Sequence, residues 1–287
     1  MDKKICVITG ANSGIGKAAA IQIINKGYFV ILGCRNKGRG EKALKEIQEI
    51  TKSNSVELMI VDMVSQKSIT GFVNSLNQKF NKIDVLINNA AEFDISSKKI
   101  TFSPEGIETV WATNHVGAVL LTNLLLSKLE LSDQGRIINI SSKGLVMFPF
   151  LKVNINDPEF TKGKYRVVKA YYQSKLAQVM FTYWLAEKLK STCITANCIR
   201  VTNVKIDISR YPNISKIQKI IYLLKSKFSI STDQMAKTYT YLATSKNVNN
   251  ITGKYFNENN KVISSNAYSS NIDNINGVME KTFEYIK

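Results

Sequence analysis

The sequence predicts an α/β fold, a doubly wound and largely parallel sheet of about seven strands with helices on both faces. Short apolar runs alternate with segments of helical periodicity along most of the chain. Strands that are apolar throughout are typical of a parallel sheet covered on both sides. A glycine-rich turn follows the first run, at the carboxyl edge where such sheets bind ligands.

The expected elements follow one another in a regular order. Continuous apolar runs predict strands at residues 5–9, 28–34, 56–61, 83–87, 135–140 and 193–199, with a short seventh at 253–256. Apolar residues spaced three and four apart predict helices at 15–25, 41–50, 68–80, 104–129 and 169–190. Irregular chain is expected at 144–168 and, mixed with helix, at 201–228.

Length and composition indicate a single domain over residues 1–287. A chain of 287 residues with 44% hydrophobic content can bury one large core, and neither a linker nor a repeat marks a boundary. Residues 217–228 are apolar on one face and basic around it. This pattern admits plain packing onto the sheet or contact with a membrane surface.

The net charge of +17 raises the question of a nucleic-acid or membrane partner. The lysines are spread along the chain, without blocks of like charge or interleaved aromatic residues, so we expect no nucleic-acid binding. No run of 18 apolar residues appears and the N-terminal segment is too short for a signal peptide, so we expect no transmembrane segment.

The cysteines and the single histidine argue against a metal site. Cys6, Cys34, Cys193 and Cys198 form no C-x-x-C pair, and each lies in or beside an apolar run. We therefore expect buried free thiols, a reducing compartment and a cytoplasmic location.

A nucleotide-binding turn is predicted where the first strand meets the first helix. Residues 9–16 read Thr-Gly-Ala-Asn-Ser-Gly-Ile-Gly. Glycines allow a tight turn and a close approach of backbone to a pyrophosphate, and the following helix offers free N–H groups. The alternative is a plain turn.

The end of the second strand favours NADP(H) over NAD(H). An NAD-selective site usually has an acidic residue there to hold the adenosine ribose hydroxyls. This chain has Arg35 instead, which can form a bidentate contact with a 2′-phosphate. Such a charged hydrogen bond contributes about 1.5–3 kcal/mol. The alternative is a surface arginine at a strand end.

Two further strand ends carry candidate cofactor contacts. Asp62, followed by Met63, ends the third strand, where the carboxylate can accept from an adenine amino group or cap the next helix. The fourth strand ends in Asn-Asn-Ala-Ala at 88–91. Small residues such as Ala90 let backbone pack near the cofactor, and amides such as Asn89 can tie adjacent loops together.

Tyr171 and Lys175 form the candidate catalytic pair. They are four residues apart in the predicted helix 169–190, so they share one face. Protonating an alkoxide at neutral pH needs an acid with a pKa near 7, whereas a free tyrosine titrates near 10. An ammonium about 4 Å away contributes about 4 kcal/mol at an effective dielectric of 20, which favours the tyrosinate by the required amount.

The surroundings of this pair support a catalytic role. Ser141 and Ser142 end the fifth strand, where a hydroxyl can hold a substrate oxygen or simply cap a loop. Asn114 lies inside the predicted helix 104–129, where asparagine is disfavoured unless it has a task such as holding a water in a kink. We interpret His115 as a packing residue or backbone hydrogen-bond partner, and not as a base.

Together these motifs resemble the short-chain dehydrogenase/reductase superfamily, which has a Rossmann-type fold. Thr-Gly-x-x-x-Gly-Ile-Gly, Asn-Asn-Ala, the mid-helix Asn, the Ser and Tyr-x-x-x-Lys occur in the family's order over residues 5–256. The resemblance implies Tyr171 as acid/base, Lys175 as its electrostatic partner and ribose ligand, Ser142 as the substrate-orienting hydroxyl, and Asn114 as part of a proton relay. It also implies cofactor contacts at Gly10, Asn12, Ser13, Gly14, Ile15, Gly16, Arg35, Asp62, Met63, Asn89, Ala90, Tyr171, Lys175 and Val204.

Finer features resemble the retinol-dehydrogenase-like branch of that family. They are Cys34-Arg35, the long interval from Ser142 to Tyr171, and the sequence of residues 171–177. The branch implies NADP(H) and a lipophilic alcohol or carbonyl substrate, and the family often forms homo-oligomers. The resemblance also implies a substrate lid within 201–230, where family members place one.

One departure from the family follows the sixth strand. The family has Pro-Gly there and, a few residues on, a Thr that contacts the nicotinamide carboxamide; this chain has Val201-Thr202 and Ile206. The departure admits a second function, a non-catalytic NADP(H)-sensing regulator on the same fold. The complete Ser, Tyr, Lys and Asn set favours the enzyme.

Overall fold

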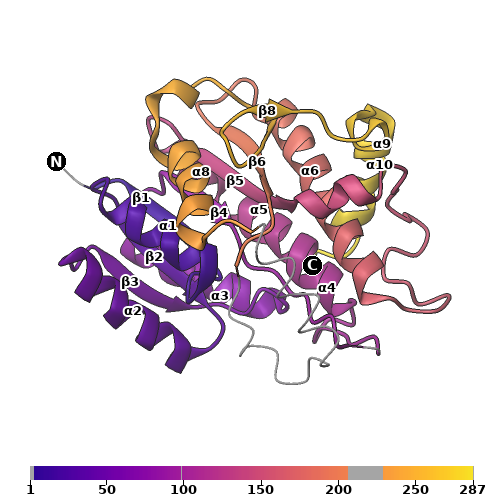
Figure 1. Ribbon diagram of the computed structural model, residues 1–287, viewed down its shortest axis with the longest axis horizontal. Helices are drawn as coiled ribbons and strands as arrows, with labels where there is room; N and C mark the ends of the chain where they lie inside the picture. Colours follow the sequence, from indigo (N-terminus) through magenta and orange to yellow (C-terminus); the bar gives the residue numbers. More distant parts are fainter. Residues whose placement is uncertain (1–2, 98, 206–228, 287) are drawn as a thin grey trace.

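A computed structural model describes residues 3–97, 99–205 and 229–286 of the chain. Within them, eight strands form one sheet in the order β3-β2-β1-β4-β5-β6-β7-β8 (Figure 1). The strands are β1 (Ile5–Thr9), β2 (Phe29–Cys34), β3 (Val56–Ile60), β4 (Val85–Asn88), β5 (Arg136–Ser142), β6 (Thr195–Val201), β7 (Lys254–Phe256) and β8 (Val262–Ile263).

The strand order reverses at β1, which pairs with β2 on one side and β4 on the other. Strands β1 to β7 pair in parallel, and the doubly wound, Rossmann-like prediction is confirmed. The prediction of about seven strands did not include β8, which pairs antiparallel with β7 over two residues. A pairing that short leaves no apolar run to detect.

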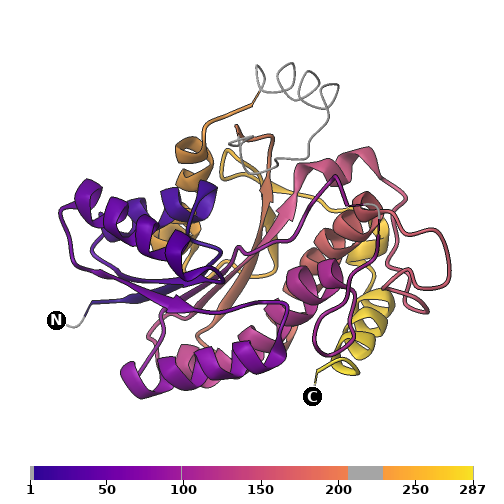
Figure 2. The same cartoon turned by 90° about the horizontal axis from the view of Figure 1, so that it is seen from below.

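Helices cover both faces of the sheet (Figure 2). They are α1 (Gly14–Ile24), α2 (Lys37–Thr51), α3 (Gln66–Lys79), α4 (Thr109–Trp111), α5 (Gly117–Glu130), α6 (Val167–Lys188), α8 (Thr232–Thr244), α9 (Ala267–Ser270) and α10 (Ile272–Phe283). Helices α1, α2 and α8 pack on one face, and α3, α5 and α6 on the other. Helix α10 packs against the outer side of α6.

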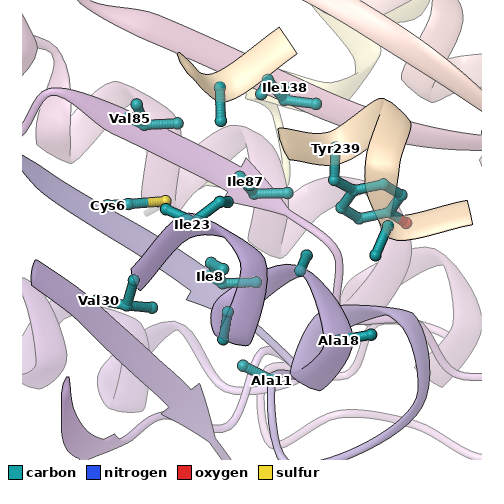
Figure 3. Close-up of a cluster of buried hydrophobic side chains, with 14 of the residues drawn as sticks. Cys6, Ile8, Ala11, Ala18, Ile23, Val30, Val85, Ile87, Ile138 and Tyr239 are labelled. Atoms are coloured by element: carbon teal, nitrogen blue, oxygen red, sulfur yellow. The ribbon is translucent and has the colours of Figure 1, made fainter. Parts of the chain in front are cut away.

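The core divides between these two faces because successive strand side chains point in opposite directions. In β1, Cys6 and Ile8 belong to the cluster under α1 and α8, whereas Val7 belongs to the cluster under α3 and α5. Figure 3 shows the first cluster, which includes Ile8 of β1, Ile23 of α1 and Tyr239 of α8. Burial on both faces fixes the register of β1 and, with it, the turn that follows.

The helix predicted at 104–129 begins later than expected and is interrupted. Gly106 has φ +79°, which is incompatible with a helix, and Glu108 caps α4 by accepting from Val110 N and Trp111 N. A π-helical turn, η1 (Ala112–Val116), then separates α4 from α5. Asn114 lies within this π-helical turn.

Of the described residues, only Thr109–Glu130 combines the length and the mean hydropathy, 1.2, of a membrane-spanning helix. Of the 18-residue stretch with this hydropathy, 78% is buried inside the fold, so the segment is a core helix here.

The predicted lid lies largely outside the described residues, which omit 206–228. The two ends of that gap lie side by side. Val204 forms a parallel bridge with Ile230, and Lys205 N donates to Ile230 O at 3.0 Å. Ile206 and the amphipathic stretch 217–228 also lie outside the described residues.

Candidate active site

The turn after β1 leaves its backbone exposed to a cavity. Gly10 (φ +67°) and Gly14 (φ +58°) adopt the left-handed conformation that glycine allows. A Cβ on Gly10 would lie 2.9 Å from Ala90 Cα, and one on Gly16 would lie 2.6 Å from Asn89 Nδ2. Side chains other than hydrogen therefore cannot be accommodated here without movement, and α1 begins at Gly14 with its N–H groups toward the cavity.

That cavity has a volume of about 750 Å³. The predicted cofactor residues that line it are Gly10, Asn12, Ser13, Gly14, Ile15, Gly16, Arg35, Asp62, Met63, Asn89, Ala90 and Val204. Tyr171 and Lys175 do not line it. Its volume, bare backbone and helix N-terminus fit the phosphates of a dinucleotide.

Sequence reasoning missed several polar residues of the same cavity, among them Lys17, Asn36, Arg39 and Glu92. Arg39 could have been suspected, since it lies four residues after Arg35. Asn36 caps α2 by accepting from Arg39 N at 2.9 Å. Arg35 lies just before this cap and Arg39 in the first turn of α2, and both line the cavity.

Asp62 lines the cavity but does not cap α3. Its Oδ1 accepts from Val64 N at 3.3 Å, and Ser65 is the N-cap, accepting from Ser68 N. Of the two roles considered for Asp62, the helix cap is wrong and the cofactor contact stays a prediction.

Of the two asparagines at the end of β4, Asn89 ties the ends of neighbouring strands together, as expected, whereas Asn88 forms its bonds inside the fold. Asn89 Nδ2 donates to Thr9 O at 2.8 Å, and Asn89 Oδ1 accepts from Tyr239 OH at 3.2 Å. Asn88 Nδ2 donates to Thr122 Oγ1 and to Asn139 Oδ1 inside the sheet. These bonds hold the ends of β1 and β4, and hence the floor of the cavity, in one arrangement.

Lys175 is a buried cation beside Tyr171 in α6. Its Nζ donates to Ile140 O of β5 at 3.0 Å and lies 5.7 Å from the centroid of the Tyr171 ring. Burial lowers the pKa of Lys175 to about 8. The cation is thus held between the end of β5 and the tyrosine one helical turn earlier.

The two serines at the end of β5 have different environments. Ser141 is buried and donates from Oγ to Lys175 O at 2.9 Å, while it accepts from Tyr255 OH at 3.4 Å. Ser142 is partly exposed, and its Oγ accepts from Gly144 N at 3.2 Å, capping the short helix η2 (Lys143–Met147). The Ser142 hydroxyl keeps its own proton to donate to a further partner.

Asn114 lies in the π-helical turn and connects three segments. Its Oδ1 accepts from Glu92 N at 2.6 Å, and its Nδ2 donates to Glu92 O at 3.1 Å. The same Nδ2 donates to Ser174 Oγ, whose hydroxyl donates to Tyr171 O at 2.7 Å. Asn114 therefore links the loop after β4 to the turn of α6 that carries Tyr171.

His115 is buried and not placed to act as a base. Complete burial lowers its pKa to about 3. Gln178 Nε2 donates to Nδ1 at 3.3 Å, so the ring proton lies on Nε2 and donates to Thr282 Oγ1 at 2.8 Å. The packing interpretation is confirmed, but the hydrogen bonds are to side chains and not to backbone.

Cys6, Cys34 and Cys198 are buried, whereas Cys193 is exposed, which corrects one expectation. Cys193 falls in the turn before β6 begins at Thr195, so no sheet face covers it. The described residues contain no cluster of His, Cys, Asp or Glu suited to a metal ion.

This fold and site define a dinucleotide-binding α/β protein of the short-chain dehydrogenase class. Residues 4–152 match the family model described as short chain dehydrogenase, and the chain belongs to this family. Its membership confirms an oxidoreductase acting on CH–OH groups.

Curated relatives and solved structures agree with this assignment. The chain is 34% identical to mouse retinol dehydrogenase 14 over 267 residues, covering 89% of this chain and 78% of that protein. It is 34% identical to human retinol dehydrogenase 13 over 260 residues, covering 88% and 76%. The predicted resemblance to the retinol-dehydrogenase-like branch is confirmed.

The fold is also shared with crystal structures of lower identity. An uncharacterized protein from Mycobacterium paratuberculosis has a TM-score of 0.75 at 22% identity, covering 99% of this chain and 93% of that one. A short chain dehydrogenase from Shigella flexneri, complexed with NADP, has a TM-score of 0.68 at 20% identity, covering 90% and 98%.

Proposed function

We propose that the protein is an NADP(H)-dependent oxidoreductase that interconverts a lipophilic alcohol and its carbonyl compound, with Tyr171 as the general acid/base. The observation that carries this proposal is the buried Lys175 ammonium, held by Ile140 O one helical turn from Tyr171 and beside the end of β5. A buried cation in that place has little structural benefit and an evident chemical one.

The side chains divide the proton chemistry among them. The Ser142 hydroxyl donates a hydrogen bond to the substrate oxygen and orients it. The Tyr171 hydroxyl protonates that oxygen as it becomes an alkoxide, or takes the proton from the alcohol in the reverse direction. The Lys175 charge stabilises the tyrosinate, and Asn114 holds the turn of α6 from which Tyr171 projects. The bound dinucleotide supplies or accepts the hydride.

Three observations support NADP(H) as that dinucleotide. The cavity has Arg35 and Arg39 on its rim. The end of β2 has no acidic residue to hold ribose hydroxyls. Structures of the same fold from Shigella flexneri and Escherichia coli were determined with NADP and NADPH.

Exposed apolar side chains next to the site support a lipophilic substrate. Val146, Met147 and Phe150, just after Ser142, are 62%, 77% and 92% exposed. Phe148 packs against Tyr172, the neighbour of Tyr171, with ring centroids 4.8 Å apart. The curated relatives are named for retinol, a lipophilic alcohol.

Turnover and binding measured on Tyr171→Phe test the mechanism. NADPH oxidation is followed with retinal and a panel of lipophilic aldehydes and ketones, and NADPH binding by its fluorescence. We expect the variant to bind NADPH as the wild type does and to lose at least about a hundredfold in kcat. Unchanged turnover in the variant contradicts the mechanism, and NADPH binding without turnover of any substrate by the wild type favours the regulator.

A further inference from the structure

An acidic side chain faces Arg35 inside the cofactor cavity. Glu92 Oε2 lies 3.9 Å from Arg35 Nη1, and both residues line the cavity. The Glu92 side chain is 29% exposed and that of Arg35 63%, so the carboxylate is the more enclosed partner. The end of β2 lacks an acid, but the loop after β4 brings one to the same place.

The backbone of Glu92 is held firmly in position. Both its N–H and its carbonyl are bonded to the Asn114 amide, at 2.6 and 3.1 Å. Asn114 is itself 2% exposed in the π-helical turn. Because the loop is clamped at this residue, the carboxylate cannot leave the cavity by movement of the main chain alone.

Charged groups of both signs surround the Glu92 carboxylate. Burial raises the pKa of the Glu92 carboxyl, Arg35 lowers it, and Asp94 and Asp62 raise it. Arg35 is thus the cation that balances Glu92. A 2′-phosphate, with a charge of about −1.5 to −2, would be placed close to the carboxylate if it bound the same guanidinium.

We propose that Glu92 competes with the cofactor's 2′-phosphate for Arg35 and is a specificity-determining residue that narrows the preference for NADP(H) over NAD(H). The inference rests on the proposed function. A ribose without the phosphate leaves the Arg35–Glu92 pair intact, and its free hydroxyl can donate to the carboxylate. The competition therefore weakens binding of NADP(H) and spares NAD(H).

Glu92→Gln tests the competition, because it removes the charge and keeps the shape. The probes are 2′,5′-ADP and 5′-AMP, which differ by the phosphate in question, and the readout is calorimetric affinity. We expect the variant to bind 2′,5′-ADP about three- to tenfold more tightly and 5′-AMP no more tightly than the wild type. Glu41→Gln is the matched control, since it removes the same charge from a 3.9 Å pair with Lys37 outside the cavity.

The outcomes separate this inference from the proposed function. If wild type and variant bind NADPH and 2′,5′-ADP with the same affinities, Glu92 does not compete and the inference fails alone. Weaker 2′,5′-ADP binding by the variant overturns it too, because Glu92 would then position Arg35. If the wild type binds neither NADPH nor 2′,5′-ADP, both the inference and the proposed function fail.

Discussion

Phe93 stacks on the ring of Tyr171, with ring centroids 4.1 Å apart and ring planes inclined by 24°. Tyr172 lies on another side of the same ring, at 5.3 Å in an edge-on arrangement. Tyr171 is therefore held between a neighbour in its own helix and a residue from the loop after β4. Since Asn114 clamps the adjacent Glu92, the stack ties the orientation of the proposed acid/base to the π-helical turn.

We expect Phe93→Leu to lower kcat about three- to tenfold with little change in NADPH affinity. The reason is that an aromatic pair contributes about 0.5–1.5 kcal/mol beyond its buried area, and here that energy restricts the Tyr171 ring. The measurement is steady-state kinetics alongside NADPH binding. Phe80→Leu is the matched control, because Phe80 pairs with Phe29 outside the cavity, with ring centroids 5.9 Å apart. An equal loss of kcat in both variants would speak against a specific role for Phe93.

Lys175 opposes stability at neutral pH, and its variants should reveal this. Burial lowers its pKa from 10.5 to about 8, so below pH 8 the folded protein retains a charge that burial disfavours. Between pH 8 and 10.5 the unfolded chain still binds this proton and the folded chain does not. Stability contributed by this group therefore rises with pH through that window.

We expect Lys175→Met to abolish turnover and to lack this rise. The measurement is the free energy of unfolding in urea at pH 7 to 10, compared between the two proteins. The wild type should gain about 2 kcal/mol relative to the variant over that range. Loss of the hydrogen bond to Ile140 O changes the variant's free energy of unfolding by an amount that does not depend on pH. Only the pH dependence of the difference in unfolding free energy between the two proteins is therefore diagnostic. A difference independent of pH would mean that Lys175 keeps its ordinary pKa.

The sequence was sufficient to predict those parts of the site that depend on local pattern. Gly10, Gly14 and Gly16 are required by one turn, and Tyr171 and Lys175 share one helix face, so short-range spacing predicts both. Glu92 and Phe93 were not predicted, because their roles come from contacts with residues far along the chain. No periodicity encodes such contacts.

The same distinction holds for the fold. Apolar strands β1 to β6 are continuous runs and were found within a few residues of their bounds. Strand β8 is two residues long, and α8, α9 and α10 follow the last recognised motif, so none of them was predicted. Helix α8 matters for the site nonetheless, since its Tyr239 reaches Asn89 at the cavity floor.

His115, the only histidine in the chain, gives one imidazole signal to follow. Burial lowers its pKa to about 3, so we expect its NMR resonance not to titrate between pH 8 and 5. From pH 6.5 down toward 3 the unfolded chain binds a proton that the folded chain excludes. The free energy of unfolding therefore decreases as the pH is lowered through this range, by up to about 1.4 kcal/mol per pH unit. His115→Gln should lack this contribution in urea unfolding at pH 7 to 5. A resonance that titrates near pH 6.5 would show that the ring reaches solvent.

Phe150 is the most exposed of the apolar side chains that follow Ser142, at 92%. The exposed ring is an apolar surface that a lipophilic substrate can cover. Covering part of a phenylalanine contributes about 1–2 kcal/mol to binding. We therefore expect Phe150→Ser to raise KM about tenfold for a long-chain aldehyde or retinal, and to leave KM for a short-chain aldehyde and the affinity for NADPH unchanged.

Leu131→Ser is the control for that measurement, because Leu131 is 64% exposed and lies at the end of α5, away from Ser142. It should change neither KM. If Phe150→Ser raises KM equally for short and long substrates, the loop positions the reacting group instead of binding an apolar chain. If it changes neither, the apolar surface has no part in substrate binding, and the proposed lipophilic substrate loses its structural support from this loop.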